Sequence, residues 1–244
     1  MICLVDGDIG VYRVGFASQD VEVHFAKARM NKWIEDICRA NNTFEYEIHL
    51  TGPNRTNFRY QIYPQYKANR TQPKPIHYDA LREHLVLRHA GIMEIEGEAD
   101  DAMADRQNDE TVICSIDKDL DQIPGEHYDF VKDVRYSVSA LRGLRFFYLQ
   151  LLQGDRTDNI PGVDGIGPKK AQAILDGVDV VESELFRVVR DAYAFKYGEK
   201  GDELMLLYGR LLKIGGGLWD FPEVKEVPAE ELPSDLIWNA MSPQ

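Results

Sequence analysis

The sequence has little cysteine and no long run of hydrophobic residues. Its 244 residues include only Cys3, Cys38 and Cys114, which are widely spaced and set among apolar neighbours. Such a trio predicts neither a disulfide framework nor a zinc site, so we expect core packing. No apolar stretch approaches the roughly 18 residues of a membrane span. The run Ile2 to Val5 meets Asp6 without a basic flank, which argues against a signal peptide, and we expect a cytoplasmic protein without membrane contact.

Acidic residues are absent from one segment of an otherwise acidic chain. The 28 Lys and Arg against 41 Asp and Glu give a formal charge of -13, which by itself argues against a polyanionic partner. The residues from Ile48 to Tyr78 nevertheless contain no Asp or Glu. The cations of this segment are Arg55, Arg59, Lys67, Arg70 and Lys74. We therefore expect it to meet a phosphate backbone, with a solvated basic loop as the alternative for Lys74.

The pattern of apolar residues predicts two structural parts. Up to residue 138, short apolar runs alternate with helical periodicity, which is typical of an α/β core with a mostly parallel sheet. The predicted strands are 2–5, 46–50, 92–95, 111–116 and 128–131, and the predicted helices are 21–40, 78–90 and 99–107. Prolines interrupt residues 52–78, so we expect a long functional excursion there. Residues 139–244 form a predicted helical module with an acidic tail and helices at 141–152, 169–175, 182–195 and 202–212.

Acidic residues follow the predicted strands in three groups, and the helical module supplies a fourth. Ligands of an open α/β sheet bind beyond the carboxyl ends of its strands, so these positions are candidate site residues. The four groups are Asp6; Glu98, Asp100 and Asp101; Asp117 and Asp119; and Asp155 and Asp158. Each alone could be a turn aspartate, a helix N-terminal acid or an N-cap. Together they would repel one another unless cations bound, and oxygen ligands without His or Cys favour Mg²⁺ or Mn²⁺.

This donor set points to hydrolysis of a nucleic-acid strand. Two divalent ions about 4 Å apart can hold the attacking water and the leaving oxygen of a phosphodiester. The sequence shows no Ser-His-Asp or Cys-His arrangement and no Walker loop that would indicate other chemistry.

A glycine-punctuated turn precedes a lysine-bearing helix near residue 168. Gly165 and Gly167 lie just before Pro168, and Lys169 and Lys170 follow in the predicted helix. The N–H groups of such a helix start bind phosphate without reading a base. An ordinary capped surface turn is the alternative, but its direct attachment to the segment GDRTDNIPG favours a contact with nucleic acid.

Five motifs resemble the 5′-nuclease family of flap endonucleases, polymerase-associated 5′ to 3′ exonucleases and bacteriophage exonucleases. They are LVDGD at 4–8 with Arg13 beyond it, YKANR at 66–70, GEADD at 97–101, SIDKDLDQI at 115–123 and GDRTDNIPGVDGIGPKKA at 154–171. Their order is that of the family, and the chain is most like its free-standing bacteriophage members. The resemblance implies a PIN-like core with a helical arch at about 52–78. It also implies a helix-three-turn-helix at about 144–176 that holds duplex DNA and binds K⁺.

The resemblance also implies roles for individual residues. The eight acids of the four groups would be metal ligands, for two ions. Arg13 and Lys67 would lie near the scissile phosphate, with Arg70 contacting the strand. Tyr66 would stack on a terminal base, and Arg59 would belong to the DNA-binding set together with Gly165, Gly167, Lys169 and Lys170.

The chain departs from the family just before the arch. Relatives usually carry another metal-binding aspartate a few residues ahead of the position of Arg59, whereas the residues from Leu50 to Arg55 include no acid. Asn54 or a water would have to substitute for it, which puts one metal site in question.

The leading prediction is a monomeric, magnesium-dependent 5′ to 3′ exonuclease with flap endonuclease activity. Its substrate would be duplex DNA with a free 5′ end or a 5′ flap, with RNA primers in an RNA-DNA hybrid as a further substrate. Two alternatives stay open: a non-catalytic duplex-DNA-binding member that has lost one metal site, and a PIN-like ribonuclease.

Overall fold

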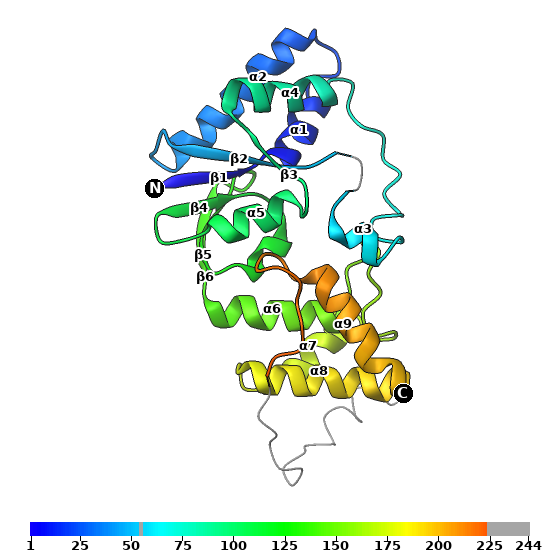
Figure 1. Cartoon of the computed structure of the whole chain (residues 1–244). Coiled ribbons are helices and arrows are strands. Elements are labelled where there is room, and N and C mark those ends of the chain that lie inside the picture. The colour runs from blue at the N-terminus through cyan, green and yellow to red at the C-terminus, as the bar shows by residue number, and fades with distance from the viewer. Residues whose placement is uncertain (54–55, 224–244) are drawn as a thin grey trace. The chain divides into compact units, whose positions relative to one another are not determined.

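The computed structural model describes residues 1–53 and 56–223, and within it the chain forms two compact units (Figure 1). The sheet unit comprises Met1–Pro64, Thr71–Ser139 and Ile214–Gly217. The helical unit comprises Gln65–Arg70, Ala140–Lys213 and, within the described residues, 218–223. Two short segments, Gln65–Arg70 and Ile214–Gly217, therefore belong to a different unit from the residues on either side of them in the sequence. Among the described residues, no helix is both long and apolar enough to cross a membrane.

A six-stranded sheet forms the centre of the sheet unit. Its strands are β1 (Ile2–Asp6), β2 (Tyr46–Thr51), β3 (Ile92–Glu94), β4 (Thr111–Cys114), β5 (Gly125–Asp129) and β6 (Val134–Val138), in the order β3-β2-β1-β4-β5-β6. The first five strands in this order pair in parallel, and β6 pairs with β5 antiparallel. The predicted α/β class with a mostly parallel sheet is confirmed.

Helices cover both faces of this sheet (Figure 1). On one face, α1 (Gly7–Phe16), α2 (Val23–Ala40) and α4 (Tyr78–His89) enclose an apolar core that contains all three buried cysteines. On the other face, α5 (Ala99–Arg106) packs with Leu4 and Ile113 through Met103. Two-sided burial explains why the central strands are continuously apolar instead of alternating with polar residues.

Helix α1 was not among the predicted helices. Glycines at positions 7, 10 and 15 lower its intrinsic helix propensity. Packing explains their presence: a Cβ on Gly10 would lie 2.5 Å from the Trp33 ring, and one on Gly15 would lie 2.7 Å from Pro75. The close approach of neighbouring elements therefore outweighs the local preference of the sequence.

The edge hairpin also differs from the prediction. The single expected strand at 128–131 is instead the end of β5 and a turn, followed by the unpredicted β6. Asp129 makes this turn, because its Oδ1 accepts the N–H groups of Val131 and Lys132, each at 2.9 Å. Within the described part of the proline-rich excursion, the helical element is α3 (Phe58–Ile62).

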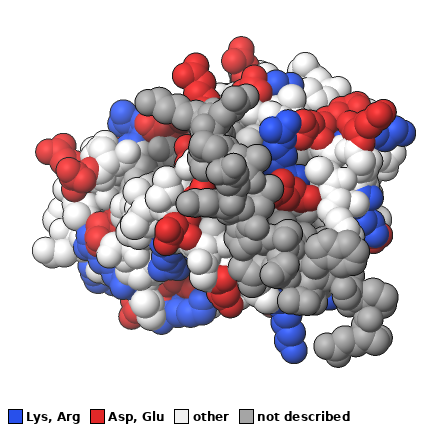
Figure 2. Space-filling view, turned by 90° about the horizontal axis from the view of Figure 1, so that it is seen from below, with Lys and Arg blue, Asp and Glu red and all other residues white. Residues whose placement is uncertain are grey.

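The helical unit contains α6 (Ala140–Gln153), α7 (Pro168–Leu175), α8 (Glu182–Tyr197) and α9 (Gly201–Leu212). Their buried side chains include Tyr148 on α6 and Tyr193 on α8. Trp219 packs edge-on against Phe147, with ring centroids 5.3 Å apart, and its ring occupies the space that a Cβ on Gly209 would need. Outside the grey residues, the face seen in Figure 2 shows basic and acidic side chains interspersed.

Candidate active site

Asp6 and the residues after β4 meet at the carboxyl edge of the sheet. Because β1 and β4 are parallel neighbours, Asp6 at the end of one strand comes beside Ser115, which follows the other. The Asp6 carboxylate accepts the Ile9 N–H at 3.0 Å, as the N-cap of α1, and the Ser115 hydroxyl at 2.8 Å. Ser115 Oγ in turn accepts the Asp117 N–H at 3.0 Å. A hydrogen-bonded chain thus links the predicted ligands Asp6 and Asp117 through a serine that was not predicted.

Burial and neighbouring carboxylates destabilise the charge on Asp6. Asp6 is only 3% exposed. Its pKa rises to about 7, chiefly because of burial and then because of repulsion by Asp8 and Asp117. The hydrogen bonds from Ile9 and Ser115 oppose this rise but do not cancel it. A cation near Asp6 would favour the ionised carboxylate, which is the electrostatic condition of a metal ligand.

Asp8 adds a further carboxylate that was not among the predicted site residues. Its Oδ2 accepts the Thr51 N–H at 2.8 Å, and its Oδ1 accepts a hydrogen bond from Arg82, which also donates to the Thr51 carbonyl. Through these contacts, Asp8 and Arg82 connect the start of α1 and the end of β2 with α4. The aspartate spacing in the DGD motif was the available sequence signal for Asp8, whereas nothing in the helical pattern singled out Arg82.

Asp101 holds the start of α5 in place. Its carboxylate receives two hydrogen bonds from Arg59, at 2.6 and 2.8 Å, and the N–H groups of Glu98 at 2.8 Å and Gly215 at 3.1 Å. Burial raises the pKa of Asp101, but Arg59 and the two N–H donors outweigh it, and the net shift is downward. These four bonds occupy the lone pairs that a metal ion would need.

Arg59 was predicted to contact DNA, and the structure favours a different role. The residue is 2% exposed, and its guanidinium faces the Asp101 carboxylate in the two-bond geometry typical of a structural arginine. The sequence could not distinguish the two roles, because both require a cation after a short loop.

The remaining acids of the sheet unit are less enclosed. Glu98 is buried and accepts the Asn57 side-chain amide at 3.2 Å, whereas Asp100, Asp117 and Asp119 are half-buried. Asp117 accepts the Asp119 N–H at 2.9 Å and begins the 3-10 turn Lys118–Gln122. Within residues 1–53 and 56–223, no three acidic, histidine or cysteine side chains converge closely enough to hold a metal ion as they stand.

The surroundings of Gly52 explain why this position before the arch carries no acidic residue. Its N–H donates to the Glu94 carbonyl at 2.6 Å, and a Cβ at this position would lie 2.6 Å from the same oxygen. No aspartate could replace Gly52 without moving β3 away from β2. The predicted substitute, Asn54, lies outside the described residues.

In the helical unit, Asp158 binds the segment Gln65–Arg70. The Tyr66 hydroxyl donates to its carboxylate at 2.9 Å, the Lys67 ammonium lies at 3.6 Å, and Arg70 donates to the other oxygen. The backbone takes part as well, since the Lys67 N–H donates to the Asp158 carbonyl at 2.9 Å. The predicted catalytic cations Lys67 and Arg70 are thus brought together on one predicted ligand.

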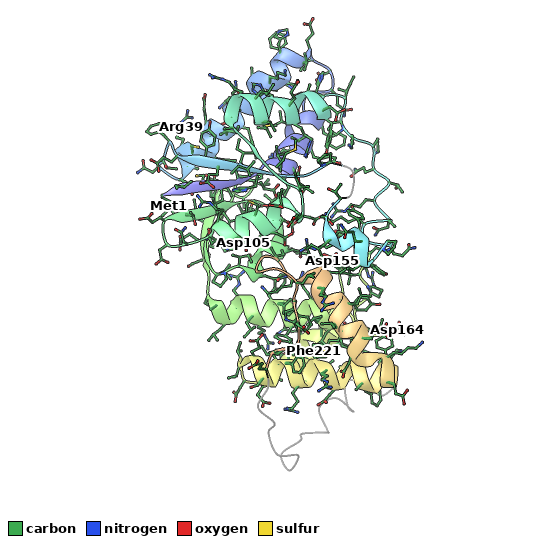
Figure 3. The ribbon with its side chains drawn as sticks, viewed as in Figure 1. Met1, Arg39, Asp105, Asp155, Asp164 and Phe221 are labelled. Atoms are coloured by element: carbon green, nitrogen blue, oxygen red, sulfur yellow. The ribbon has the colours of Figure 1, made fainter. Side chains whose placement is uncertain are left out.

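Tyr66 and Asp155 also have defined places within this unit. Tyr66 is 1% exposed, so its ring is not available to stack on a terminal base, contrary to the predicted contact. Asp155, labelled in Figure 3, shapes the loop after α6, where its Oδ1 accepts the Thr157 N–H at 2.6 Å and the Asp158 N–H at 3.4 Å.

The glycine turn before α7 is open to solvent. A Cβ on Gly165 or Gly167 would have no neighbour within 4 Å, and Lys169 and Lys170 are exposed in the first turn of α7. Gly165 has a φ of +86°, which favours glycine. Earlier in the loop, Asp164 pairs with Lys196 at 2.7 Å. Arg13, the other predicted cation, is exposed on α1, about two turns beyond Asp6.

The family of this chain follows from its sequence matches. Residues 1–143 match the family described as 5′-3′ exonuclease, N-terminal resolvase-like domain. The chain is 34% identical over 191 residues to the flap endonuclease Xni of Shewanella baltica, covering 70% of this chain and 72% of that protein. DNA polymerase I of Bacillus caldotenax is 30% identical over 211 residues, 75% of this chain and 24% of the polymerase. The chain belongs to the 5′-nuclease family.

Solved structures agree on the fold. The T5 5′-exonuclease superposes with a TM-score of 0.58 at 18% identity, over 86% of each chain. A complex of the bacteriophage T5 flap endonuclease with DNA and metal ions superposes with a TM-score of 0.51 at 19% identity, over 84% of this chain and 96% of that one.

Proposed function

We propose that this protein is a divalent-metal-dependent 5′ to 3′ exonuclease with flap endonuclease activity on duplex DNA. The observation that carries the proposal is the buried Asp6 carboxylate, linked through Ser115 to Asp117 and repelled by Asp8 and Asp117. A fold without a ligand has little reason to retain this arrangement at the carboxyl edge of a parallel sheet. The nuclease relatives and the metal-bound structural neighbour support the same reading.

The donor set of the sheet unit fits a hard divalent cation. It consists of carboxylates, and the charge of Asp6 needs compensation at neutral pH. We assign metal binding to Asp6, Glu98, Asp100, Asp117 and Asp119, and a structural role to Asp101 because its oxygens are occupied by Arg59 and backbone N–H groups. Since no three of these side chains converge as they stand, ion binding would require rotation of the half-buried carboxylates.

We further propose that two bound cations carry out the hydrolysis. Two bound Mg²⁺ or Mn²⁺ ions would supply a hydroxide nucleophile and stabilise the leaving oxygen of the phosphodiester. Asp155 and Asp158 are proposed as further ligands, with Asp158 also holding Lys67 and Arg70. Arg13, Lys67 and Arg70 would contact the substrate phosphate electrostatically.

We assign duplex binding to the turn before α7. Gly165 and Gly167 form an open turn at the start of a helix, and Lys169 and Lys170 add positive charge, which suits the phosphates of a duplex. A helix-three-turn-helix with a K⁺ site, action on RNA-DNA hybrids, a monomeric state, a cytoplasmic location and a bacteriophage source all stay predictions.

One cleavage assay tests the proposed function. Duplexes with a 5′-labelled flap or nick are incubated with the protein, with Mg²⁺ or with a chelator, alongside Asp117→Ala and the exposed control Asp109→Ala. We expect Mg²⁺-dependent cleavage by the unmodified protein and by Asp109→Ala, and a loss of at least about a hundredfold in Asp117→Ala, because its carboxylate is assigned to the metal.

The same assay separates the alternatives. Binding of the flap without cleavage would identify a non-catalytic DNA-binding member, and cleavage confined to single-stranded RNA would identify a PIN-like ribonuclease. Full activity of Asp117→Ala would refute the assignment of the site.

A further inference from the structure

A cavity of about 660 Å³ opens on the sheet unit away from the acidic edge. Tyr46, the first residue of β2, lines it, together with the last turns of α2 and α4. Figure 3 labels Arg39 at this end of the unit, near Met1 at the start of β1. Asp6 and Asp117 instead follow the carboxyl ends of β1 and β4. The cavity therefore lies at the opposite end of a parallel sheet from the proposed metal ligands.

One wall of the cavity is fixed by a hydrogen-bonded network. Asn31 Oδ1 lies 2.6 Å from His84 Nε2 and 2.8 Å from His89 Nε2, and the Tyr46 hydroxyl lies 2.9 Å from His89 Nδ1. With Asn31 accepting from both imidazoles, each histidine carries its proton on Nε2, and His89 Nδ1 accepts the Tyr46 O–H. Burial lowers the pKa of both histidines, which keeps them neutral. A wall held in this way is preorganised for a ligand.

The cavity lining is positively charged. Arg39 from α2 and Arg88 from α4 both line it, and Glu35 is the one acid among the lining residues. Arg39 already meets Asp36 at 3.3 Å, whereas among the described residues no acidic group lies within 4.0 Å of Arg88. Two guanidiniums from different helices favour an anion, and their planar donors match phosphate or carboxylate oxygens.

An aromatic side chain lines the same cavity without packing in the fold. Phe44 is 97% exposed, more than any other large hydrophobic residue that the structure describes, so its ring stands in solvent at the mouth of the cavity, between the end of α2 and the start of β2. An exposed phenyl ring presents a flat apolar surface to solvent, and such rings stack on planar aromatic ligands. Tyr46 adds a second ring to the lining.

We propose that this cavity binds a planar aromatic anion the size of a nucleoside monophosphate, with its ring on Phe44 and its phosphate at Arg88 and Arg39. The volume falls within the range of about 300 to 1,000 Å³ that is usual for small-molecule sites. The lining combines a stacking surface, two phosphate-binding groups, the side-chain N–H groups of Asn31 and the amide side chain of Asn42, which can hydrogen-bond a base. The proposal goes beyond the nuclease function and holds whether or not the chain cleaves DNA.

Isothermal titration calorimetry of the full chain in a chelating buffer tests the proposal. The chelator prevents metal ions from drawing nucleotide to the acidic edge. The titrants are a deoxynucleoside 5′-monophosphate, the same nucleoside without phosphate, and inorganic phosphate. We expect the monophosphate to bind at least about tenfold more tightly than either part, because ring stacking and the charged contacts each contribute.

Three variants locate the binding. Phe44→Ala and Arg88→Ala should each weaken the monophosphate by about tenfold or more, and Arg88→Lys should retain part of the affinity because it keeps the charge. Arg135→Ala, which removes an exposed arginine of β6 outside the cavity, is the matched control and should bind normally. Phe44 is so exposed that its replacement will not disturb folding.

Several outcomes would overturn the proposal. Absence of saturable binding of the monophosphate below about 10 mM would show that the cavity does not bind this ligand. Equal affinity for inorganic phosphate alone would leave an anion site without the aromatic component. Unchanged affinity in both Phe44→Ala and Arg88→Ala would place the binding elsewhere on the chain.

Discussion

Arg59 and Asp101 illustrate how one pair of side chains carries a structural role where a functional one was predicted. Arg59→Ala would leave the Asp101 carboxylate largely buried without its main partner, so we expect a loss of about 3 kcal/mol in the free energy of unfolding. Urea denaturation measures it. The exposed Arg13→Ala is the control and should change stability by less than about 0.5 kcal/mol. An unchanged urea midpoint in Arg59→Ala would return Arg59 to the DNA-contacting set.

Asp6 predicts an unusual pH dependence of stability. Its pKa of about 7 lies above the ordinary value of 3.8, so the folded chain binds a proton that the unfolded chain has already released between these values. Stability from this group is therefore lost as pH rises from about 4 through 7, when no divalent ion is present. Asp6→Asn removes the charge and keeps one oxygen to accept the Ile9 N–H, while its amide N–H can donate to the Ser115 hydroxyl.

In metal-free buffer we expect Asp6→Asn to be more stable than the unmodified protein by about 4 kcal/mol at pH 8, with the difference vanishing near pH 4. Urea midpoints across this range measure the effect. Adding Mg²⁺ should raise the midpoint of the unmodified protein and leave that of Asp6→Asn nearly unchanged. An identical pH profile for both proteins would contradict the raised pKa of Asp6.

At the scale of elements, α1 shows packing overriding helix propensity. Gly10→Ala would improve the intrinsic propensity by about 1 kcal/mol, but the new Cβ would lie 2.5 Å from the Trp33 ring. We expect a net loss of about 1 to 3 kcal/mol from overpacking, measured by urea denaturation. The double variant Gly10→Ala with Trp33→Leu should lose less than the sum of its single variants, because the smaller side chain makes room. A more stable Gly10→Ala would refute this contact.

The elements that the sequence predicted are those whose pattern matches their burial. The helical periodicity of residues 21–40 and the apolar run at 2–5 identified α2 and β1, since each has a clear buried stripe or face. Helix α1 and strand β6 were missed because glycines and exposed polar residues obscure their pattern. What fixes them is contact with Trp33 or with β5, and such contacts are distant in the sequence.

The candidate site was also only partly predictable from the sequence. The positions of the strand ends predicted that Asp6 and Asp117 lie at one edge, because the parallel strands β1 and β4 bring their carboxyl ends together. Spacing alone could not distinguish the structural role of Asp101 from the proposed metal-binding role of Asp6. Arg59 pairs with the Asp101 carboxylate, whereas no cation compensates the charge of Asp6 among its described contacts. Nor could it reveal that Tyr66 is buried, since an aromatic residue beside Lys67 suits stacking and packing equally well.

At the scale of the whole molecule, Asp158 is expected to control the accessibility of the segment Gln65–Arg70. Asp158→Ala removes the acceptor of Tyr66, Lys67 and Arg70, so the segment should open more often. We expect trypsin to cleave after Lys67 and Arg70 at least about tenfold faster than in the unmodified protein, measured by mass spectrometry of timed digests.

The control for this experiment is Asp164→Ala, which removes an exposed carboxylate from the same loop and breaks only its surface pair with Lys196. Its digestion after Lys67 and Arg70 should match that of the unmodified protein. Equal cleavage rates in all three proteins would show that Asp158 does not hold the segment.

The interleaving of the two units constrains how this gene can have changed. The chain passes from one unit to the other after Pro64, Arg70, Ser139, Lys213 and Gly217. A single recombination event would therefore exchange parts of both units and could not replace either one whole. Tyr66 and its partner Asp158, which lie 92 positions apart in the sequence, would have to be exchanged together to keep their hydrogen bond. A chimaera that exchanges only one of these two segments is thus expected to lose this contact.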